Sequence, residues 1–286
     1  MNSLSIETTD NNYNIIDGNI KKYLSANSVE LLILTPCYGG MCNVNYTCCL
    51  IETLNLCKKY NIKASVEFCR NDSLVSRARN NLVARAMSRP SVTHILFIDS
   101  DITWSAFDVL KLIVADKSLV GGVYPLKKYM WNTLLDEKTN VADILQKKRQ
   151  SKFDSFISDS DFLQHRLLKY NINFLDNVLE IDNNLCKVKH LATGFMMFKR
   201  NTIEQMTRAF PSTKYTDDVG FLTPEESEYA HALFDCGVED GHYFSEDWLF
   251  CHRWSNMGGN IYVDVSINLT HSGIEDYRGS FISSII

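Results

Sequence analysis

The sequence lacks several features that would assign it to a large class of proteins at once. Its longest apolar runs fall far short of the roughly 20 residues that a transmembrane helix needs, and its polar first residues, MNSLSIETTDNN, are not a signal or transit peptide. The 29 lysines and arginines do not outnumber the 34 aspartates and glutamates, and the net charge is −5. We therefore expect a cytoplasmic protein (host cytoplasm or virion if viral), with no membrane span and no nucleic-acid partner.

The cysteines show no pairing pattern. There are nine of them, an odd number, scattered along the chain without a CxxC pair. Neither a disulfide framework nor a zinc knuckle fits this distribution. We expect buried free thiols in a reducing compartment.

What the sequence does contain is an alternation of strand and helix patterns in its first half. Strands are expected at 31–36, 63–69, 93–101 and 118–125, because short apolar runs there are bounded by polar or turn residues. The segments between the first four strands have apolar residues at helical spacing. Such alternation predicts a parallel α/β sheet that is covered by helices on both faces.

The chain divides by pattern into four regions. Residues 1–28 lack apolar periodicity and predict a loose N-terminal arm. Residues 29–126 form the α/β half, and 127–186, which are more charged and less periodic, predict an insertion that is partly mobile. Order returns in 187–286, with short strands around Gly194 and a helix from about Ser245.

The stretch ILFIDSDITW is the most informative in the chain. Its apolar run stops at Asp99, Ser100 and Asp101, where the third strand of the sheet should end. Ligands of such sheets bind beyond the carboxyl ends of the strands, and residues two apart in extended chain point the same way. Two carboxylates placed so closely repel unless a cation lies between them, and a divalent ion suits their hard oxygens. The plain alternative is that Asp101 caps the following helix.

Three further pieces occur in the second half. Gly194 lies in the sequence ATGFM between two short strands, Glu246 and Asp247 open a helix, and His271 follows the last strand. Together with Asp99-Ser100-Asp101, these pieces resemble, in type and order, the DxD motif, glycine loop, xED motif and C-terminal histidine of the GT-A fold glycosyltransferases. The resemblance covers about residues 31–271, with the middle insertion unmatched.

The resemblance implies a fold and an activity. The fold would be a GT-A type, Rossmann-like mixed sheet flanked by helices, with 29–126 binding the nucleotide sugar and 187–286 forming the acceptor-binding, catalytic half. The activity would be metal-dependent transfer of a sugar from a UDP- or GDP-sugar to a hydroxyl of a glycan, protein or small acceptor. The metal, Mn²⁺ or Mg²⁺, would be bound directly by Asp101 and His271, while Asp99 would contact the ribose or the water shell of the metal.

The same resemblance implies the catalytic base. An inverting enzyme needs a carboxylate on the acceptor side to take the proton of the acceptor hydroxyl, and Asp247 matches that position. Glu246 would be the fallback base or would orient the acceptor. Both acids could instead only complement the dipole of their helix. The sequence leaves the stereochemistry open, with inversion as our expectation.

Donor contacts are expected near the ends of the first strands. Arg79 would project close to the apolar face of its helix and so needs an anionic partner, either a donor phosphate or a structural carboxylate. Gly194 would let the chain pass close to a sugar, or would only form a hairpin turn. Tyr243, just before the xED acids, is the best aromatic candidate for a sugar face. The predicted donor-binding set is Thr35, Pro36, Tyr38, Arg70, Arg79, Asp99, Ser100 and Gly194.

Two other functions remain as alternatives. A sugar nucleotidyltransferase shares an α/β nucleotide-binding core but usually has a glycine-rich, basic loop after its first strand. Here that loop contains Gly39 and Gly40 without lysine or arginine. The third possibility is a glycosyltransferase-like domain that binds a sugar without turnover. The identity of the sugar, the acceptor and the oligomeric state are not encoded in any pattern that we recognise.

Overall fold

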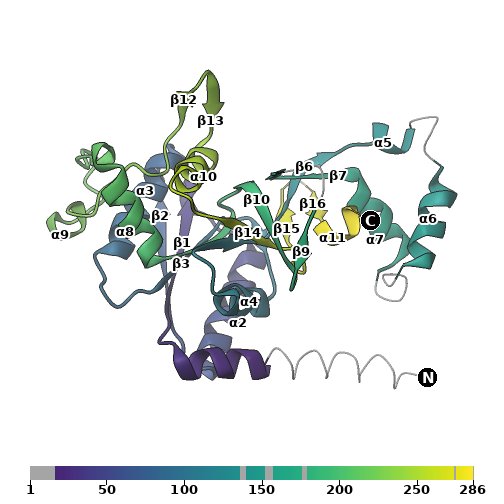
Figure 1. The fold of residues 1–286 in the computed structure, drawn as a ribbon, viewed down its shortest axis with the longest axis horizontal. Helices are drawn as coiled ribbons and strands as arrows, with labels where there is room; N and C mark the ends of the chain where they lie inside the picture. The colour runs from purple at the N-terminus through teal and green to yellow at the C-terminus, as the bar shows by residue number, and fades with distance from the viewer. Residues whose placement is uncertain (1–16, 136–139, 152–156, 176–178, 274, 286) are drawn as a thin grey trace.

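The protein is built around one large twisted sheet. The computed structural model describes residues 17–135, 140–151, 157–175, 179–273 and 275–285. Among these, nine strands form the central sheet in the order β2-β1-β3-β11-β5-β14-β10-β8, with β9 paired to β10 (Figure 1). The strands are β1 (Glu30–Cys37), β2 (Lys63–Arg70), β3 (His94–Ile98), β5 (Leu119–Gly121), β8 (Ile172–Phe174), β9 (Ile181–Asp182), β10 (Leu185–Leu191), β11 (Phe195–Lys199) and β14 (Ile261–Asp264).

The sheet is mixed, as the resemblance implied, whereas the alternation of strands and helices in the first half predicted a parallel one. β1 is parallel to both β2 and β3. β11 then lies antiparallel between β3 and β5, and β14 is parallel to β5. The apolar run that we expected as one strand over 118–125 is divided, because only Leu119–Gly121 belongs to this sheet. The coarse prediction of an α/β fold with a mixed sheet flanked by helices is confirmed.

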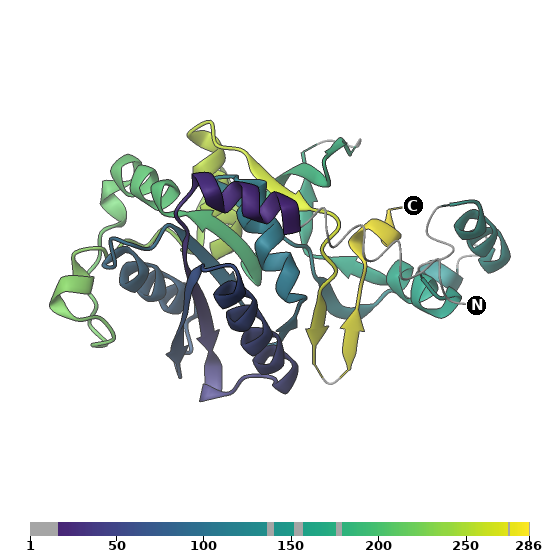
Figure 2. The same cartoon turned by 90° about the horizontal axis from the view of Figure 1, so that it is seen from below.

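Helices cover both faces of the sheet (Figures 1 and 2). Alternate residues of β1 supply the two cores: Leu32 and Leu34 pack on one face, and Leu31 and Ile33 on the other. All four are fully buried, which explains the continuous apolar run. The first face is covered by α3 (Val75–Met87), α8 (Arg200–Ala209) and α10 (Glu246–Asn256), and the second by α2 (Val44–Lys59) and α4 (Ala106–Ala115).

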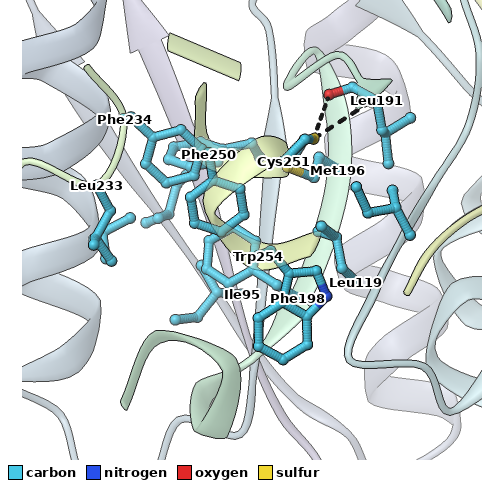
Figure 3. Packing of buried hydrophobic residues seen from close by; sticks show 14 of the residues in the cluster. Ile95, Leu119, Leu191, Met196, Phe198, Leu233, Phe234, Phe250, Cys251 and Trp254 are labelled. Atoms are coloured by element: carbon cyan, nitrogen blue, oxygen red, sulfur yellow. Dashed lines mark hydrogen bonds between the residues drawn. The ribbon is translucent and has the colours of Figure 1, made fainter. Parts of the chain in front are cut away.

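Aromatic side chains fill the core under α10 (Figure 3). The rings of Phe234 and Phe250 stack with centroids 4.1 Å apart, and Phe97 meets Phe234 edge-on at 5.3 Å. Truncating a buried phenylalanine to alanine costs about 3–5 kcal/mol. This packing fixes α10, and with it the acids at its first turn, against strand β3.

The N-terminal region differs from its prediction where the structure describes it. Residues 17–26 form a helix, and Ile20 is only 1% exposed within the second core. The burial of Ile20 corrects the expectation of a loose arm for these residues. A single buried apolar side chain holds this helix on the core, and one residue shows no periodicity in the sequence. Residues 1–16 lie outside the described part.

Three small sheets are attached to the central one. They are β4 (Ile102–Thr103) with β15 (Thr270–Ser272) and β16 (Asp276–Arg278), β6 (Pro125–Tyr129) with β7 (Leu168–Tyr170), and the hairpin β12 (Gly237–Glu239) with β13 (His242–Phe244). The expected insertion, 127–186, contributes β6 to β9 and the helices α5 (Asn132–Leu135), α6 (Val141–Gln150) and α7 (Asp159–Leu167). Its parts at 136–139, 152–156 and 176–178 are outside the described residues, so its expected mobility stays a prediction.

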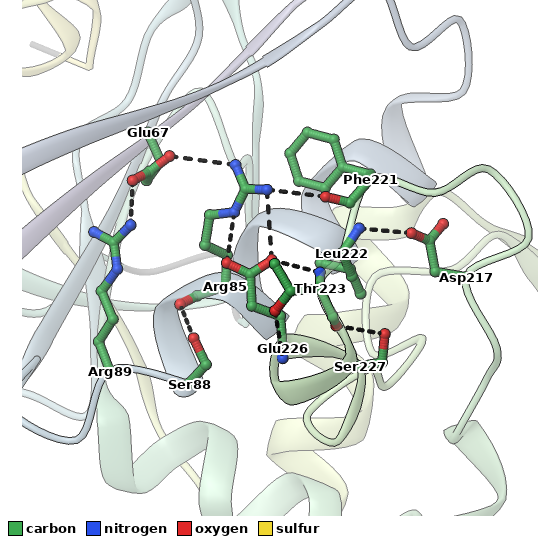
Figure 4. A network of polar contacts seen from close by, with 10 residues as sticks. All are labelled: Glu67, Arg85, Ser88, Arg89, Asp217, Phe221, Leu222, Thr223, Glu226 and Ser227. Atoms are coloured by element: carbon green, nitrogen blue, oxygen red, sulfur yellow. Dashed lines mark hydrogen bonds and ion pairs between the residues drawn. The ribbon is translucent and has the colours of Figure 1, made fainter.

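An arginine of α3 anchors the segment that leads towards α10 (Figure 4). Arg85 donates to Glu226 of α9 (Pro224–Ser227) at 3.0 Å, and to the backbone oxygen of Phe221 at 2.9 Å. Its guanidinium also lies 4.2 Å from the centre of the Phe221 ring and pairs with Glu67 of β2. These contacts tie residues 221–226, which lead towards α10, to the sheet.

Within the described residues, no helix combines the length and apolar character that a bilayer crossing requires.

Candidate functional site

The predicted aspartates lie at the carboxyl end of β3, as expected. Asp99 is the first residue after the strand, and its backbone N–H donates to the carbonyl oxygen of Gly194 at 3.1 Å. The antiparallel pairing of β3 with β11 produces this contact, because Phe195 is opposite Ile98. Two predicted pieces almost a hundred residues apart are therefore in direct contact.

Arg79 joins the DxD segment to the xED segment. Its Nη2 donates to Asp99 at 3.0 Å and its Nε to Glu246 at 3.3 Å. The side chain is only 4% exposed, and its guanidinium carbon lies 5.1 Å from the centre of the Phe97 ring. Of the two roles left open by the sequence, the structure has the ion pair with carboxylates. Contact with a donor phosphate stays a prediction, and Arg79 Nη1 is buried without a hydrogen-bond partner among the described residues.

Asp101 has its own cationic partners, different from those of Asp99. Lys127 of β6 places Nζ 2.6 Å from Asp101 Oδ2, and His271 places Nε2 3.4 Å from the same oxygen. Burial would raise the pKa of Asp101, but hydrogen bonds from His271 and Lys127 outweigh it and lower the pKa to about 2.

Strand pairing brings His271 to this position. β15 pairs antiparallel with β4, which follows Asp101 directly, and the Ser272 N–H donates to the Asp101 carbonyl oxygen at 2.8 Å. His271 Nδ1 lies 2.9 Å from the carbonyl oxygen of Pro125. A carbonyl oxygen only accepts, so Nδ1 must carry a proton, and Nε2, which faces Asp101, donates to it when protonated and presents a lone pair when not.

This orientation makes the Asp101–His271 pair chemically suited to a divalent cation. Nε2 and the carboxylate oxygen lie 3.4 Å apart, and a divalent cation could bind both where a proton on Nε2 would otherwise lie between them. The Asp99 carboxylate does not join this pair in the described structure, because it accepts from Arg79. Accordingly, no group of three or more His, Cys, Asp or Glu in the described chain could hold a metal ion. Two protein ligands would leave several positions for the oxygens of a diphosphate.

Asp247 is a buried carboxylate at the start of α10. It is 7% exposed, and its Oδ1 accepts hydrogen bonds from the Ser245 hydroxyl and from the Trp248 N–H. Burial and the neighbouring charge of Glu246 raise the pKa of Asp247, although Ser245 and Arg79 oppose the shift. A raised pKa makes an ionised carboxylate a better proton acceptor. Within the described residues, no hydrogen bond reaches its Oδ2.

Gly194 is required by a close neighbour. A Cβ at this position would lie 2.6 Å from the Tyr124 ring, closer than real side chains approach. The Tyr124 side chain is 7% exposed, and its ring meets that of His271 edge-on at 5.1 Å. Burial raises the pKa of Tyr124, and the charges of Asp99 and Asp247 raise it further. Tyr124 therefore lies among the motifs and stays a neutral phenol.

The remaining donor-binding predictions have different outcomes. Thr35 is fully buried and its hydroxyl bonds to that of Tyr46 at 2.6 Å, so the side chain cannot touch a ligand directly. β1 continues to Cys37, which keeps Thr35 inside the sheet. Pro36 is half-buried and Tyr38 is 76% exposed at the end of β1, while Arg70 ends β2 and is exposed. Ser100 is half-buried, and its carbonyl oxygen accepts from the Asn43 N–H at 2.9 Å.

Two residues of the assembled site were missed by sequence reasoning. Tyr124 lies in the apolar run 118–125, which was expected only as a strand, and Lys127 was counted as the start of the insertion. Neither had a signal in the sequence, because their roles depend on partners far along the chain. The adjacent lysines 127 and 128 give no indication of which one faces Asp101.

A separate cavity of 1310 Å³ contains none of these residues. It is lined by residues of α4, β10 and β14, including Leu110, Leu185 and Tyr262. Its charged lining is mixed, with Lys117 and Lys187 beside Glu180 and Asp182. Because none of the candidate site residues line this cavity, it is not part of the candidate site.

Comparisons with known proteins include a distant likeness to a solved structure. No protein-family model matches the chain, and no curated protein matches it either. Among solved structures, A197 from STIV is similar, with a TM-score of 0.45 and 17% sequence identity over 86% of each chain. A likeness this remote carries no argument about function.

Proposed function

We propose that this protein is a GT-A type glycosyltransferase that moves a sugar from a nucleoside diphosphate sugar to an acceptor hydroxyl with inversion. One observation carries the proposal: four separated sequence pieces converge at the carboxyl end of β3. Asp99 contacts Gly194 through the backbone, Arg79 joins Asp99 to Glu246, and Asp101 lies beside His271. Such convergence at the edge where α/β sheets bind ligands supports a shared site.

The chemistry assigned to Asp247 follows from its burial. Its carboxylate would take the proton of the acceptor hydroxyl while that oxygen forms a bond to the anomeric carbon. The bond from this carbon to the diphosphate oxygen breaks, and the nucleoside diphosphate leaves with the bonding electron pair. Glu246 is paired with Arg79 and Asp247 is not, so Asp247 is the better base. Glu246 would hold Arg79 in position beside Asp99.

Asp101 and His271 would hold the cation, Mn²⁺ or Mg²⁺. When bound, such an ion neutralises the developing charge of a leaving diphosphate. Pro125 supports this role, because its carbonyl oxygen fixes the ring of His271 with Nε2 towards Asp101. The β12–β13 hairpin, adjacent in sequence to α10, exposes 70% of Tyr243 and offers a flat face to an acceptor sugar.

A donor screen tests the proposal. The protein would be incubated with a panel of UDP- and GDP-sugars, Mn²⁺ and an acceptor mixture, and nucleoside diphosphate release and sugar transfer would be measured. We expect release from one donor class, and an inverted anomeric configuration in the product by NMR. Asp247→Asn should retain donor binding and lose transfer by several orders of magnitude.

Other outcomes would assign other functions. Formation of a nucleotide sugar from a nucleoside triphosphate and a sugar phosphate would indicate a nucleotidyltransferase. Tight sugar binding without release from any donor would indicate a binding domain without turnover. Near wild-type transfer by Asp247→Asn would place the base elsewhere or indicate retention of configuration.

A further inference from the structure

Lys127 occupies a position in the candidate site that neither the sequence motifs nor the proposed function explain. Its Nζ lies 2.6 Å from Asp101 Oδ2, the same oxygen that His271 Nε2 approaches at 3.4 Å. The side chains of Lys127 and Asp101 are 35% and 36% exposed, so the pair faces solvent and a ligand could reach it. A resident ammonium therefore already neutralises the carboxylate that a divalent cation would need.

The backbone makes room for this lysine. A Cβ on Gly273 would lie 2.9 Å from Lys127 Cδ, so the stem of Lys127 packs against a residue without a side chain. Gly273 directly follows β15, the strand that carries His271, and Lys127 belongs to β6, whose Pro125 carbonyl accepts from His271. The same two strands thus set both partners of Asp101.

Electrostatics makes the ammonium and the cation alternatives. One carboxylate oxygen cannot neutralise an ammonium at hydrogen-bond distance and a divalent ion at the same time without strong repulsion between the two cations. Within the described chain, Asp101 is the carboxylate paired with both Lys127 and His271. Asp99 offers Lys127 no replacement, because it is bound to the buried Arg79.

We propose that Lys127 is an exchangeable counter-ion: it holds Asp101 in the cation-free protein, is displaced when a divalent cation binds, and then contacts the diphosphate of the donor. The inference rests on the proposed function for the identity of the diphosphate. A lysine ammonium is a compact point charge on a flexible stem, which suits a change of partner over a few ångströms. Lys127 would thus lower cation affinity while raising affinity for the anion that follows.

Direct binding measurements test the first half. Free Mn²⁺ would be followed by electron paramagnetic resonance while the metal alone is titrated, without nucleotide. We expect Lys127→Gln to bind Mn²⁺ about tenfold tighter than the wild type, the factor associated with one charge-assisted hydrogen bond. Lys127→Arg should stay near the wild type because it keeps the charge, and Lys128→Gln on the same strand should change nothing. Asp101→Asn should abolish binding in both backgrounds.

The second half predicts an effect of the opposite sign. UDP and GDP would be titrated as probes by calorimetry with Mn²⁺ at saturation. Lys127→Gln should bind the competent nucleotide about tenfold more weakly, since one cation is missing beside the diphosphate. A merely structural lysine would not produce tighter metal and weaker nucleotide binding together. Thermal unfolding of each variant would confirm that it is folded.

The two proposals fail in different ways. If the wild type and Lys127→Gln bind Mn²⁺ equally and Asp101→Asn does not bind it, the counter-ion role is overturned while the metal site stands. Weaker Mn²⁺ binding by Lys127→Gln would overturn it too, as would unchanged nucleotide binding. If no variant binds Mn²⁺, the metal-dependent part of the proposed function falls, and the exchange falls with it.

Discussion

The backbone N–H of Asp99 donates a hydrogen bond to the carbonyl oxygen of Gly194 at 3.1 Å. This bond continues the pairing of β3 and β11 for one step beyond Ile98 and Phe195. It fixes the first aspartate of the DxD segment against the glycine loop. The loop can approach only because position 194 has no side chain to collide with Tyr124.

Gly194→Ala should therefore damage both stability and the site. A Cβ would lie 2.6 Å from the Tyr124 ring, and overpacking of this kind costs about 1–3 kcal/mol. Urea denaturation would measure the loss, and Gly237→Ala is the matched control, because its Cβ would meet only Leu249 at 3.8 Å. Adding Tyr124→Leu should recover part of the loss. A Gly194→Ala variant as stable as Gly237→Ala would contradict the close packing.

Arg79→Met should destabilise the protein strongly. The substitution removes the buried guanidinium between Asp99 and Glu246 and leaves both carboxylates without this partner. The cost in free energy of unfolding should be about 3 kcal/mol. Arg77→Met is the matched control on the same helix: Arg77 is 37% exposed and bridges no second carboxylate in the part of the chain that the structure describes, so its loss should cost less than that of Arg79. Equal denaturation midpoints for the two variants would show that the Arg79 bridge is not what joins the DxD and xED segments.

Much of the fold followed from local pattern. The buried run that ends at Asp99 and the apolar spacing of α3 were visible because hydrophobic periodicity is a local property. The insertion of β11 between β3 and β5 was not, since strand order depends on long-range pairing that spacing does not encode. The end of β1 was not visible either: the strand continues two residues beyond Thr35, whose side chain faces Tyr46 inside the core.

The residues of the candidate site were predicted from the sequence, but which of them pair with one another was not. Asp101 and His271 were expected to bind one ion with Asp99 at its water shell or at the ribose, and the sequence did not show that each aspartate has its own basic partner. Arg79 bonds to Glu246, which is 167 residues away, and Lys127 reaches Asp101 from another sheet. Such pairs are set by tertiary packing, and a burial pattern along one helix indicates only that a partner is needed.

Asp247→Asn should stabilise the protein at neutral pH while it lowers transfer. Burial and Glu246 raise the pKa of Asp247, so the folded state retains its proton to higher pH than the unfolded state. The ionised group therefore costs stability as pH rises above the unfolded value of 3.8. We expect a gain of about 0.5–2 kcal/mol at pH 7, the usual range for a single stabilising substitution. Denaturation below pH 3.8 should show no gain, and a gain that persists there would refute the ionisation argument.

The buried His94 should make the protein less stable in mild acid. Burial lowers the pKa of His94 from 6.5 to about 4, and nearby Lys199 adds to the shift. The folded state therefore binds fewer protons than the unfolded state between these values, and stability falls as pH drops below 6.5. From pH 7 to pH 5 the loss from this residue should be about 2 kcal/mol. Urea denaturation at both pH values would measure it, with His94→Gln as the comparison because it keeps a polar side chain that does not titrate. The pKa of His190 is lowered by burial in the same way, so some loss of stability between pH 7 and pH 5 should remain in His94→Gln. If that variant loses as much stability as the wild type, His94 is not a source of the loss.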